Sequence, residues 1–391
     1  MSGRDELRTR AVAKEPEVAN RERPVLITGG AGFIGCNLAH RLLQQGRRVV
    51  LFDNLSRAGV TRNVAWLRET HGDNVRVEIG DVRDYAAVQR VMSGVGHVFH
   101  FAAQVAVTTS LDDPVDDFTV NARGTLNVLE AIRRSPERPP IVLTSTNKVY
   151  GGLDDLALEL RDSRYTPSDG AIAARGVSEA RPLDFHSPYG CSKGTADQYV
   201  RDYTRSFGLE TVVFRMSCIY GPHQFGTEDQ GWVAHFLIRA LAGDPIVLYG
   251  DGKQVRDVLF VEDLVNAFLL AQRNMTTLSG QAFNIGGGAA NTISLLELLD
   301  LIGTINGARP DVTFEPWRVG DQRYYVSDTT RFARATGWAQ RVSVVEGVTR
   351  LRDWLQSELV RATRPARRNK RAIVIDPVSG GESSIVDRGA A

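Results

Sequence analysis

Short apolar runs and amphipathic segments alternate along the first half of the chain. Residues 24–28 form an apolar run that leads into a glycine-rich turn, and Leu38, Leu42 and Leu43 then recur at helical spacing. Further patterns of buried strands follow at 48–52, 75–79, 97–101, 141–145 and 211–215. This alternation predicts a doubly wound parallel sheet of the α/β class, the Rossmann architecture.

After residue 215 the alternation breaks, which predicts a second, smaller domain facing the sheet. We expect the Rossmann domain to span 24–215 and a C-terminal substrate-binding domain to take up most of 216–360, with segments returning to the Rossmann domain. Helix-rich segments at 294–301, 329–337 and 344–359 close the fold. The charged leader 1–23 and the basic tail 361–391 are expected to be disordered.

A polar insertion at 151–185 is longer than a strand-helix connection requires. Segments of this kind often cover a binding site or join subunits. A lid, an oligomer contact and a solvated loop therefore all stay open as interpretations.

Composition narrows the range of partners. The formal net charge is +1 over 391 residues, of which 42% are hydrophobic, and this favours a small-molecule partner over nucleic acid or an anionic membrane. Cys36, Cys191 and Cys218 match neither a disulfide framework nor a metal site, which fits a reducing compartment. The sequence shows no signal-peptide pattern and no apolar run of about 18 residues. We expect a soluble cytoplasmic protein with no bound metal and no nucleic-acid or membrane partner.

The glycine-rich turn suggests a cofactor. Gly29, Gly32 and Gly35 form the pattern G-x-x-G-x-x-G, which allows a tight turn and close approach of the backbone to a pyrophosphate. Asp53 ends the next strand, where an acid accepts hydrogen bonds from the ribose hydroxyls of NAD and repels the extra phosphate of NADP. We therefore predict NAD, although the basic Arg57 close behind weakens the argument.

Ligands of such sheets lie beyond the carboxyl ends of the strands. The residues expected at the cofactor belong to the glycine turn, the strand ends and a later helix: Gly29, Gly32, Phe33, Ile34, Gly35, Asp53, Asn54, Ser56, Arg57, Asp81, Val82, Ala102, Ala103, Gln104, Asn121, Thr144, Tyr189 and Lys193. Within this set, Asp81 and Val82 are expected to face the adenine.

A phenol and an ammonium lie four residues apart in SPYGCSK, so Tyr189 and Lys193 share one face of a predicted helix. The lysine charge is expected to lower the pKa of the tyrosine, so that the phenol can take a proton from a sugar hydroxyl near neutral pH. Cys191 points away from this face, which disfavours a catalytic thiol. The pair predicts the oxidation of an alcohol.

Together with the glycine turn and Asp53, this pair resembles the extended short-chain dehydrogenase/reductases, the family of nucleotide-sugar epimerases and dehydratases. The resemblance implies that Thr146, in TSTNKVYG, hydrogen-bonds the reacting hydroxyl and completes a catalytic set with Tyr189 and Lys193. Dehydratases of the family carry Asp-Glu directly after this threonine, because elimination needs both a donor and an acceptor of protons. This chain has Asn147 and Lys148 there, which disfavours elimination.

The resemblance also implies a substrate site. The blocks DFHSPYGCSKG, FRMSCIYGPHQFGTEDQGW, GDGKQVRDVL and NIGGGAANTISLLEL look like those of the CDP-paratose/CDP-tyvelose 2-epimerases within the family. Arg256 and Arg318 lie where related epimerases hold the substrate diphosphate, and a planar guanidinium fits phosphate oxygens two at a time. The implied substrate residues are Gln104, Thr146, Asn147, Lys148, Gln224, Gln230, Trp232, Arg256 and Arg318. His223 stands where related proteins carry an arginine, so its role stays open.

These expectations converge on an isomerase of carbohydrate biosynthesis, an NAD-dependent epimerase that inverts carbon 2 of a CDP-sugar by transient oxidation. The open alternatives are an enzyme like UDP-glucose 4-epimerase, another sugar-modifying enzyme of an antibiotic pathway, and a noncatalytic NAD-sensing module. The resemblance further implies a homodimer or homotetramer in which two long helices of each subunit pair with their symmetry mates.

Overall fold

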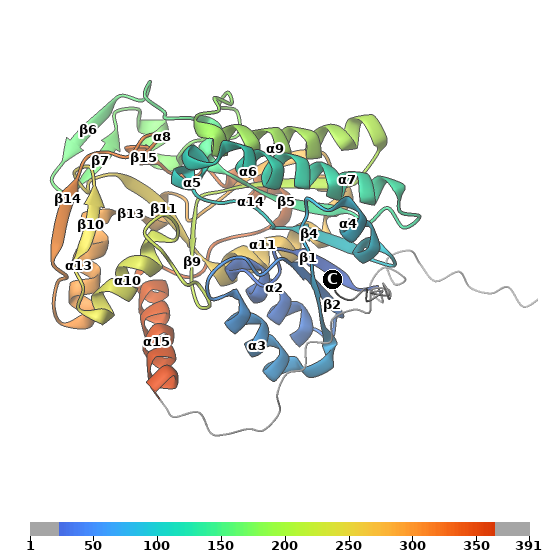
Figure 1. The fold of residues 1–391 in the computed structure, drawn as a ribbon. Helices are drawn as coiled ribbons and strands as arrows, with labels where there is room; N and C mark the ends of the chain where they lie inside the picture. The colour runs from blue at the N-terminus through green and yellow to red at the C-terminus, as the bar shows by residue number, and fades with distance from the viewer. Residues whose placement is uncertain (1–22, 364–391) are drawn as a thin grey trace, which may run out of the picture.

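A seven-stranded parallel sheet forms the centre of the molecule (Figure 1). The computed structural model describes residues 23–363. The strand order is β12-β8-β5-β4-β1-β2-β3, and every neighbouring pair is parallel. The strands are β1 (Val25–Thr28), β2 (Val49–Asp53), β3 (Val75–Ile79), β4 (His97–His100), β5 (Ile141–Thr146), β8 (Thr211–Met216) and β12 (Gln281–Ile285). The prediction of a doubly wound parallel sheet is confirmed.

Helices cover both faces of this sheet. On one face lie α4 (Tyr85–Met92), α7 (Gly124–Arg134) and α9 (Ser187–Phe207), and on the other α2 (Phe33–Gln44), α3 (Val60–His71) and α11 (Val261–Arg273) (Figure 1). Side chains of β1 alternate between the two cores, with Leu26 in the first and Ile27 in the second. Because both faces of the inner strands are buried, β1 and β2 read as continuous apolar runs, whereas the edge strand β3 is partly exposed.

The smaller domain has its own sheets and core. It contains β9 (Cys218–Tyr220), β10 (Ile246–Tyr249), β11 (Val255–Phe260), β13 (Thr292–Ser294), β14 (Val312–Glu315), β15 (Tyr324–Tyr325), α10 (Trp232–Ala242), α13 (Leu295–Asn306) and α15 (Val344–Thr363). Strand β11 pairs with β9, β13 and β15, while β10 pairs with β14. Ser294 and Glu297 form a capping box that starts α13.

Several segments after residue 215 pack on the first sheet. They are α11, β12, α12 (Met275–Leu278) and α14 (Thr330–Thr336), whose Phe332 lies in the core beneath the sheet. The predicted leader 1–23 and tail 361–391 lie outside the described residues, apart from Arg23 and the end of α15. Helix α15 continues to Thr363, so the tail was predicted to begin too early.

The insertion at 151–185 packs on the smaller domain. It forms a hairpin of β6 (Leu158–Arg161) and β7 (Arg164–Pro167), followed by α8 (Gly170–Arg175). Arg164 forms an ion pair with Glu297 at 2.6 Å, and the Tyr165 hydroxyl donates to Asp251 at 2.6 Å. No residue of 151–185 lines the large cavity, which argues against a lid, and the contacts of Arg164 and Tyr165 argue against a solvated loop. An oligomer contact stays a prediction.

A buried ion pair joins α9 to β8. The Nε and Nη2 atoms of Arg215 lie 2.8 and 3.0 Å from the two carboxylate oxygens of Asp197, and the two side chains are 4% and 0% exposed. Arg215 also donates to the Tyr150 hydroxyl, which donates to Asn284 of β12. This network fixes the helix that carries Tyr189 against three neighbouring segments.

Candidate active site

One cavity of about 800 Å³ lies between the carboxyl ends of the sheet strands and the smaller domain. With the single exception of Asn121, all the residues predicted at the cofactor and substrate line it: Gly29, Gly32, Phe33, Ile34, Gly35, Asp53, Asn54, Ser56, Arg57, Asp81, Val82, Ala102, Ala103, Gln104, Thr144, Thr146, Asn147, Lys148, Tyr189, Lys193, Gln224, Gln230, Trp232, Arg256 and Arg318. The fold thus brings together residues that lie far apart in the sequence.

Asn121 lies behind this wall, in a wide helical turn over Thr119–Arg123. Its side chain is 1% exposed and donates to Asp117 at 3.1 Å and to Ser192 at 3.0 Å. Because Ser192 is on α9, Asn121 supports the helix that carries Tyr189 and Lys193. The prediction that Asn121 faces the cofactor was wrong, because its side chain lies behind the cavity wall.

The glycine turn leaves the backbone open to the cavity. Gly29 has φ +67, and a Cβ there would lie 2.6 Å from the backbone nitrogen of Ala102. A Cβ on Gly35 would lie 2.5 Å from the Gly29 carbonyl oxygen. Side chains therefore cannot occupy these positions, and α2, which begins at Phe33, presents the backbone N–H groups of its first turn. This arrangement fits the diphosphate of a dinucleotide.

Asp53 lies at the end of β2 beside this turn. Its carboxylate accepts hydrogen bonds from the backbone nitrogens of Ala31 at 3.0 Å and Leu55 at 2.9 Å. Burial raises the pKa of the Asp53 carboxyl, and these bonds oppose the shift. An anchored carboxylate at this strand end is the group that a ribose requires. The described residues thus fit NAD, and the orientation of the cofactor stays a prediction.

Asp81, the candidate partner of the adenine, is held by its neighbours. Asn54 donates to it at 2.9 Å, and Arg83 donates through its guanidinium at 2.8 and 2.9 Å. The hydrogen bond from Arg83 is the main cause that holds the pKa of Asp81 at about 2. The carboxylate therefore stays ionised and fixed in place near neutral pH.

Tyr189 and Lys193 project from α9 toward Thr146 at the end of β5. The Lys193 ammonium donates to the Thr144 carbonyl oxygen at 2.6 Å, and burial lowers the pKa of this lysine to about 8. Burial raises the pKa of Tyr189 to about 12, while a hydrogen bond with Thr146 and the charge of Arg57 lower it. The predicted net lowering of the tyrosine pKa is contradicted, since burial and the charge of Asp117 outweigh the effects of Thr146 and Arg57.

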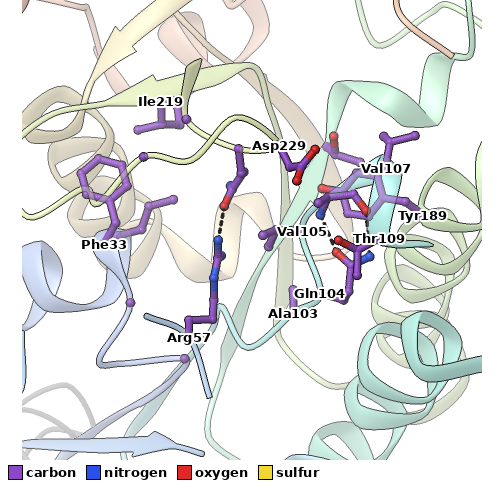
Figure 2. Close-up of a pocket in the computed structure, with 18 of the residues that line it drawn as sticks. Phe33, Arg57, Ala103, Gln104, Val105, Val107, Thr109, Tyr189, Ile219 and Asp229 are labelled. Carbon is purple, nitrogen blue, oxygen red and sulfur yellow. Dashed lines mark hydrogen bonds between the residues drawn. The ribbon is translucent and has the colours of Figure 1, made fainter. Parts of the chain in front are cut away.

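Arg57 extends across the cavity. Figure 2 shows its side chain between Phe33 on one side and Ala103 and Gln104 on the other, and its Nη2 atom donates to Gln230 of the smaller domain at 2.7 Å. Arg57 therefore bridges the two walls of the cavity.

The substrate end of the cavity is rich in cations. Arg256 is 6% exposed and forms an ion pair with Asp321 at 2.6 Å. Lys148 donates to the Gly320 carbonyl oxygen at 2.9 Å, and burial, with the charge of Arg256, lowers its pKa to about 8. Asn147 donates to Gln322 at 3.0 Å. Loop 320–322 thus organises the polar groups that follow Thr146.

Arg318 lies at the mouth of this end. Its guanidinium is 3.7 Å from the ring centroid of Tyr249 and 2.7 Å from a carboxylate oxygen of Glu228. His223, whose role the sequence left open, stacks on Trp66 with ring centroids 3.8 Å apart. Burial lowers the pKa of His223 to about 4, so this ring is neutral at pH 7.

Some residues of the cavity were missed by the sequence analysis. Glu228 and Asp229 belong to the quoted block FGTEDQGW, and Asp321 follows Arg318 by three residues. The position of Asp321, close to a candidate phosphate-binding arginine in the sequence, could have indicated that it belongs to the site. Thr108 had no such signal, because α5 (Val107–Asp112) is short and follows a loop.

Two further features concern metals and membranes. Within residues 23–363 we find no group of three or more His, Cys, Asp or Glu side chains that could hold a metal ion. In the same part of the chain, no helix has the length and apolar character needed to cross a bilayer.

Comparison with known proteins agrees with this geometry. The chain is 45% identical over 340 residues to CDP-paratose 2-epimerase of Salmonella typhi, covering 85% of this chain and 99% of that protein. It is 31% identical to a dTDP-glucose 4,6-dehydratase of Xanthomonas campestris, over 84% of this chain and 92% of the relative. The solved UDP-glucose 4-epimerase of Thermus thermophilus, in complex with NAD, matches with a TM-score of 0.70 and 32% identity, over 85% and 99% of the two chains.

Residues 25–286 match the family described as NAD dependent epimerase/dehydratase. This match confirms the resemblance read from the sequence, the enzymatic character and NAD as the cofactor. The chain belongs to the NAD dependent epimerase/dehydratase family.

Proposed function

We propose that the protein inverts carbon 2 of a CDP-sugar whose carbon 3 bears no oxygen, interconverting CDP-paratose and CDP-tyvelose. The observation that carries the proposal is the 45% identity to a CDP-paratose 2-epimerase along 99% of that protein. The position after Thr146 supports it, because Asn147 and Lys148 stand where elimination would need an acid pair.

The chemistry of such a sugar restricts the mechanism. Without an oxygen at carbon 3, no ketone there can acidify the proton of carbon 2, and carbon 1 is held by the nucleotide. Carbon 2 itself must therefore be oxidised, and its hydrogen leaves as a hydride. NAD, when bound, supplies the reversible hydride acceptor. The reaction is redox-neutral overall, because the same hydride returns to the opposite face of carbon 2.

The side chains of the protein handle the proton of the carbon 2 hydroxyl. Tyr189 takes this proton during oxidation and gives it back during reduction, while Thr146 orients the reacting oxygen. Arg57 and Thr146 favour the phenolate and so oppose the effect of burial on the pKa of Tyr189. Arg256 and Arg318 hold the diphosphate while the sugar turns about its linkage and presents the other face.

The first test follows deuterium. CDP-paratose labelled with deuterium at carbon 2 is incubated with the purified protein, and the product is examined by mass spectrometry and NMR. We expect the label to remain at carbon 2 of CDP-tyvelose. Release of the label into water would exclude direct return of the hydride.

The second test removes the phenol. Tyr189→Phe should lower kcat by roughly 10²- to 10⁴-fold, the usual contribution of a general acid-base group. Tyr199→Phe is the matched control, because this residue lies on the same helix but does not line the cavity, and the variant keeps the aromatic ring. Equal activity of the two variants would remove Tyr189 from the mechanism.

Inversion at carbon 4 of a UDP-hexose is the second candidate, favoured by the similarity to the UDP-glucose 4-epimerase of Thermus thermophilus. Parallel assays with CDP-paratose, CDP-tyvelose and UDP-glucose separate the two. A protein that retains NAD but turns over no nucleotide sugar would instead support the noncatalytic module.

We also propose a homodimer that forms through α9 and its neighbouring helices. Tyr199 and Phe207 on α9 are 46% and 42% exposed, and Phe118 on the neighbouring α6 (Pro114–Phe118) is 53% exposed. Covering these apolar side chains would stabilise a dimer, and light scattering after gel filtration measures its mass. A cytoplasmic location stays a prediction, supported by the unpaired Cys36, Cys191 and Cys218.

A further inference from the structure

A tight turn carries two carboxylates to the mouth of the cavity. Thr227 and Gln230 exchange backbone hydrogen bonds of 2.9 and 3.2 Å, so Glu228 and Asp229 are the two central residues of the turn. The turn lies between β9 and α10, and both acids line the cavity. We call residues 227–230 the acidic turn.

The acidic turn binds the guanidinium of Arg318. The Nη2 atom of Arg318 lies 2.7 Å from the Glu228 carboxylate, and its Nη1 atom lies 3.2 Å from the Glu228 carbonyl oxygen and 3.5 Å from Asp229. The Tyr249 hydroxyl also donates to Glu228. This hydrogen bond and the charge of Arg318 lower the pKa of Glu228, so the carboxylate is ionised at pH 7.

The same turn is fastened to the opposite wall. The Thr108 hydroxyl donates to Asp229 at 2.9 Å, and Arg57 donates to Gln230 at 2.7 Å. Figure 2 shows Arg57 and Asp229 on the two sides of the cavity from which these contacts are made. The acidic turn is therefore held in place by both domains, with its charges directed at the cavity.

We propose that Glu228 is a built-in competitor of the substrate diphosphate, occupying Arg318 until a nucleoside diphosphate displaces it. The inference deepens the proposed function and rests on it. The guanidinium of Arg318, which binds the Glu228 carboxylate, can bind phosphate oxygens equally well. A diphosphate at Arg318 would also lie beside two like charges, which is unfavourable unless Glu228 moves away. Glu228 is therefore a residue that sets the affinity for the substrate.

The test replaces the carboxylate by its neutral isostere. Glu228→Gln keeps an oxygen that can accept from the Tyr249 hydroxyl but removes the charge that competes for Arg318. We expect the dissociation constant of CDP, measured by titration calorimetry at low salt, to fall roughly three- to tenfold. High salt should narrow the difference, because it screens charges at a partly exposed site.

A matched control separates competition from net charge. Asp244→Asn makes the same change in charge in the same domain. Asp244 pairs with Arg239 at 3.0 Å, and neither residue lines the cavity. This variant should bind CDP like the unchanged protein. An equal gain of affinity in both variants would show a long-range charge effect and overturn the inference.

The remaining outcomes are distinguishable. If the unchanged protein binds CDP and Glu228→Gln binds it equally or more weakly, the inference is overturned. The proposed function is then left intact. A protein that binds none of CDP, UDP and dTDP overturns the proposed function. If the unchanged protein prefers UDP or dTDP, the same comparison is made with that nucleotide. Glu228→Ala, checked for folding by circular dichroism, must shift the affinity in the same direction as Glu228→Gln.

Discussion

The ion pair between Arg215 and Asp197 allows a sharp test of what holds α9, the helix of Tyr189 and Lys193, in place. Asp197→Ala removes both hydrogen bonds to Arg215 and leaves a guanidinium that is 4% exposed without its counter-charge. Breaking a buried pair from one side costs about 3–5 kcal/mol of unfolding free energy. Because Tyr189 lies about two turns earlier on the same helix, we expect kcat to fall as well.

The assay is denaturation by urea, followed by circular dichroism, alongside the epimerase rate. Asp202→Ala is the control, since within residues 23–363 this exposed acid on α9 accepts a hydrogen bond from Ser206 alone, and its loss should cost less than about 0.5 kcal/mol. Asp197→Leu combined with Arg215→Met should recover much of the loss, because no unpaired charge remains. The reasoning is refuted if Asp197→Ala and Asp202→Ala unfold at the same urea concentration.

Three further predictions concern ligands and pH. Arg256→Met should raise the KM for the nucleotide sugar about 10- to 100-fold by removing charged hydrogen bonds to the diphosphate, whereas Arg239→Met on α10 should leave it unchanged. Asp53→Ala should reduce the NAD retained through gel filtration, measured by absorbance of the denatured supernatant; full retention would contradict its role. Burial lowers the pKa of His97 and His100 to about 3. The unfolded chain therefore binds more protons below pH 6.5, and stability should fall toward acid by up to about 1.4 kcal/mol per pH unit for each histidine, which urea titrations from pH 7 to pH 5 would measure.

Much of the Rossmann sheet was predictable from the sequence because most of its strands are buried on both faces. Six of its seven strands were predicted within one residue of their observed ends. The seventh, β12, was missed as a strand. It joins the edge of the sheet at β8 after the chain has passed through the smaller domain, so strand-helix alternation along the sequence did not point to it.

The composition of the cavity was also largely predictable, whereas its electrostatics were not. Residue types and spacing placed Tyr189 and Lys193 together, but the pKa of Tyr189 depends on burial, which spacing does not reveal. Likewise, the sequence pointed to Arg318 without its partner Glu228, because the two are 90 residues apart and meet only through the fold. Long-range pairs of this kind need the tertiary structure.

The insertion at 151–185 has a consequence for the fate of a half-converted sugar. It leaves the Rossmann domain after β5, grips the smaller domain through Arg164 and Tyr165, and re-enters at α9. These contacts resist separation of the two domains. The walls of the cavity can therefore stay together while the oxidised sugar turns. The proposed ketone would then be confined until it is reduced, and premature escape into solution would be rare.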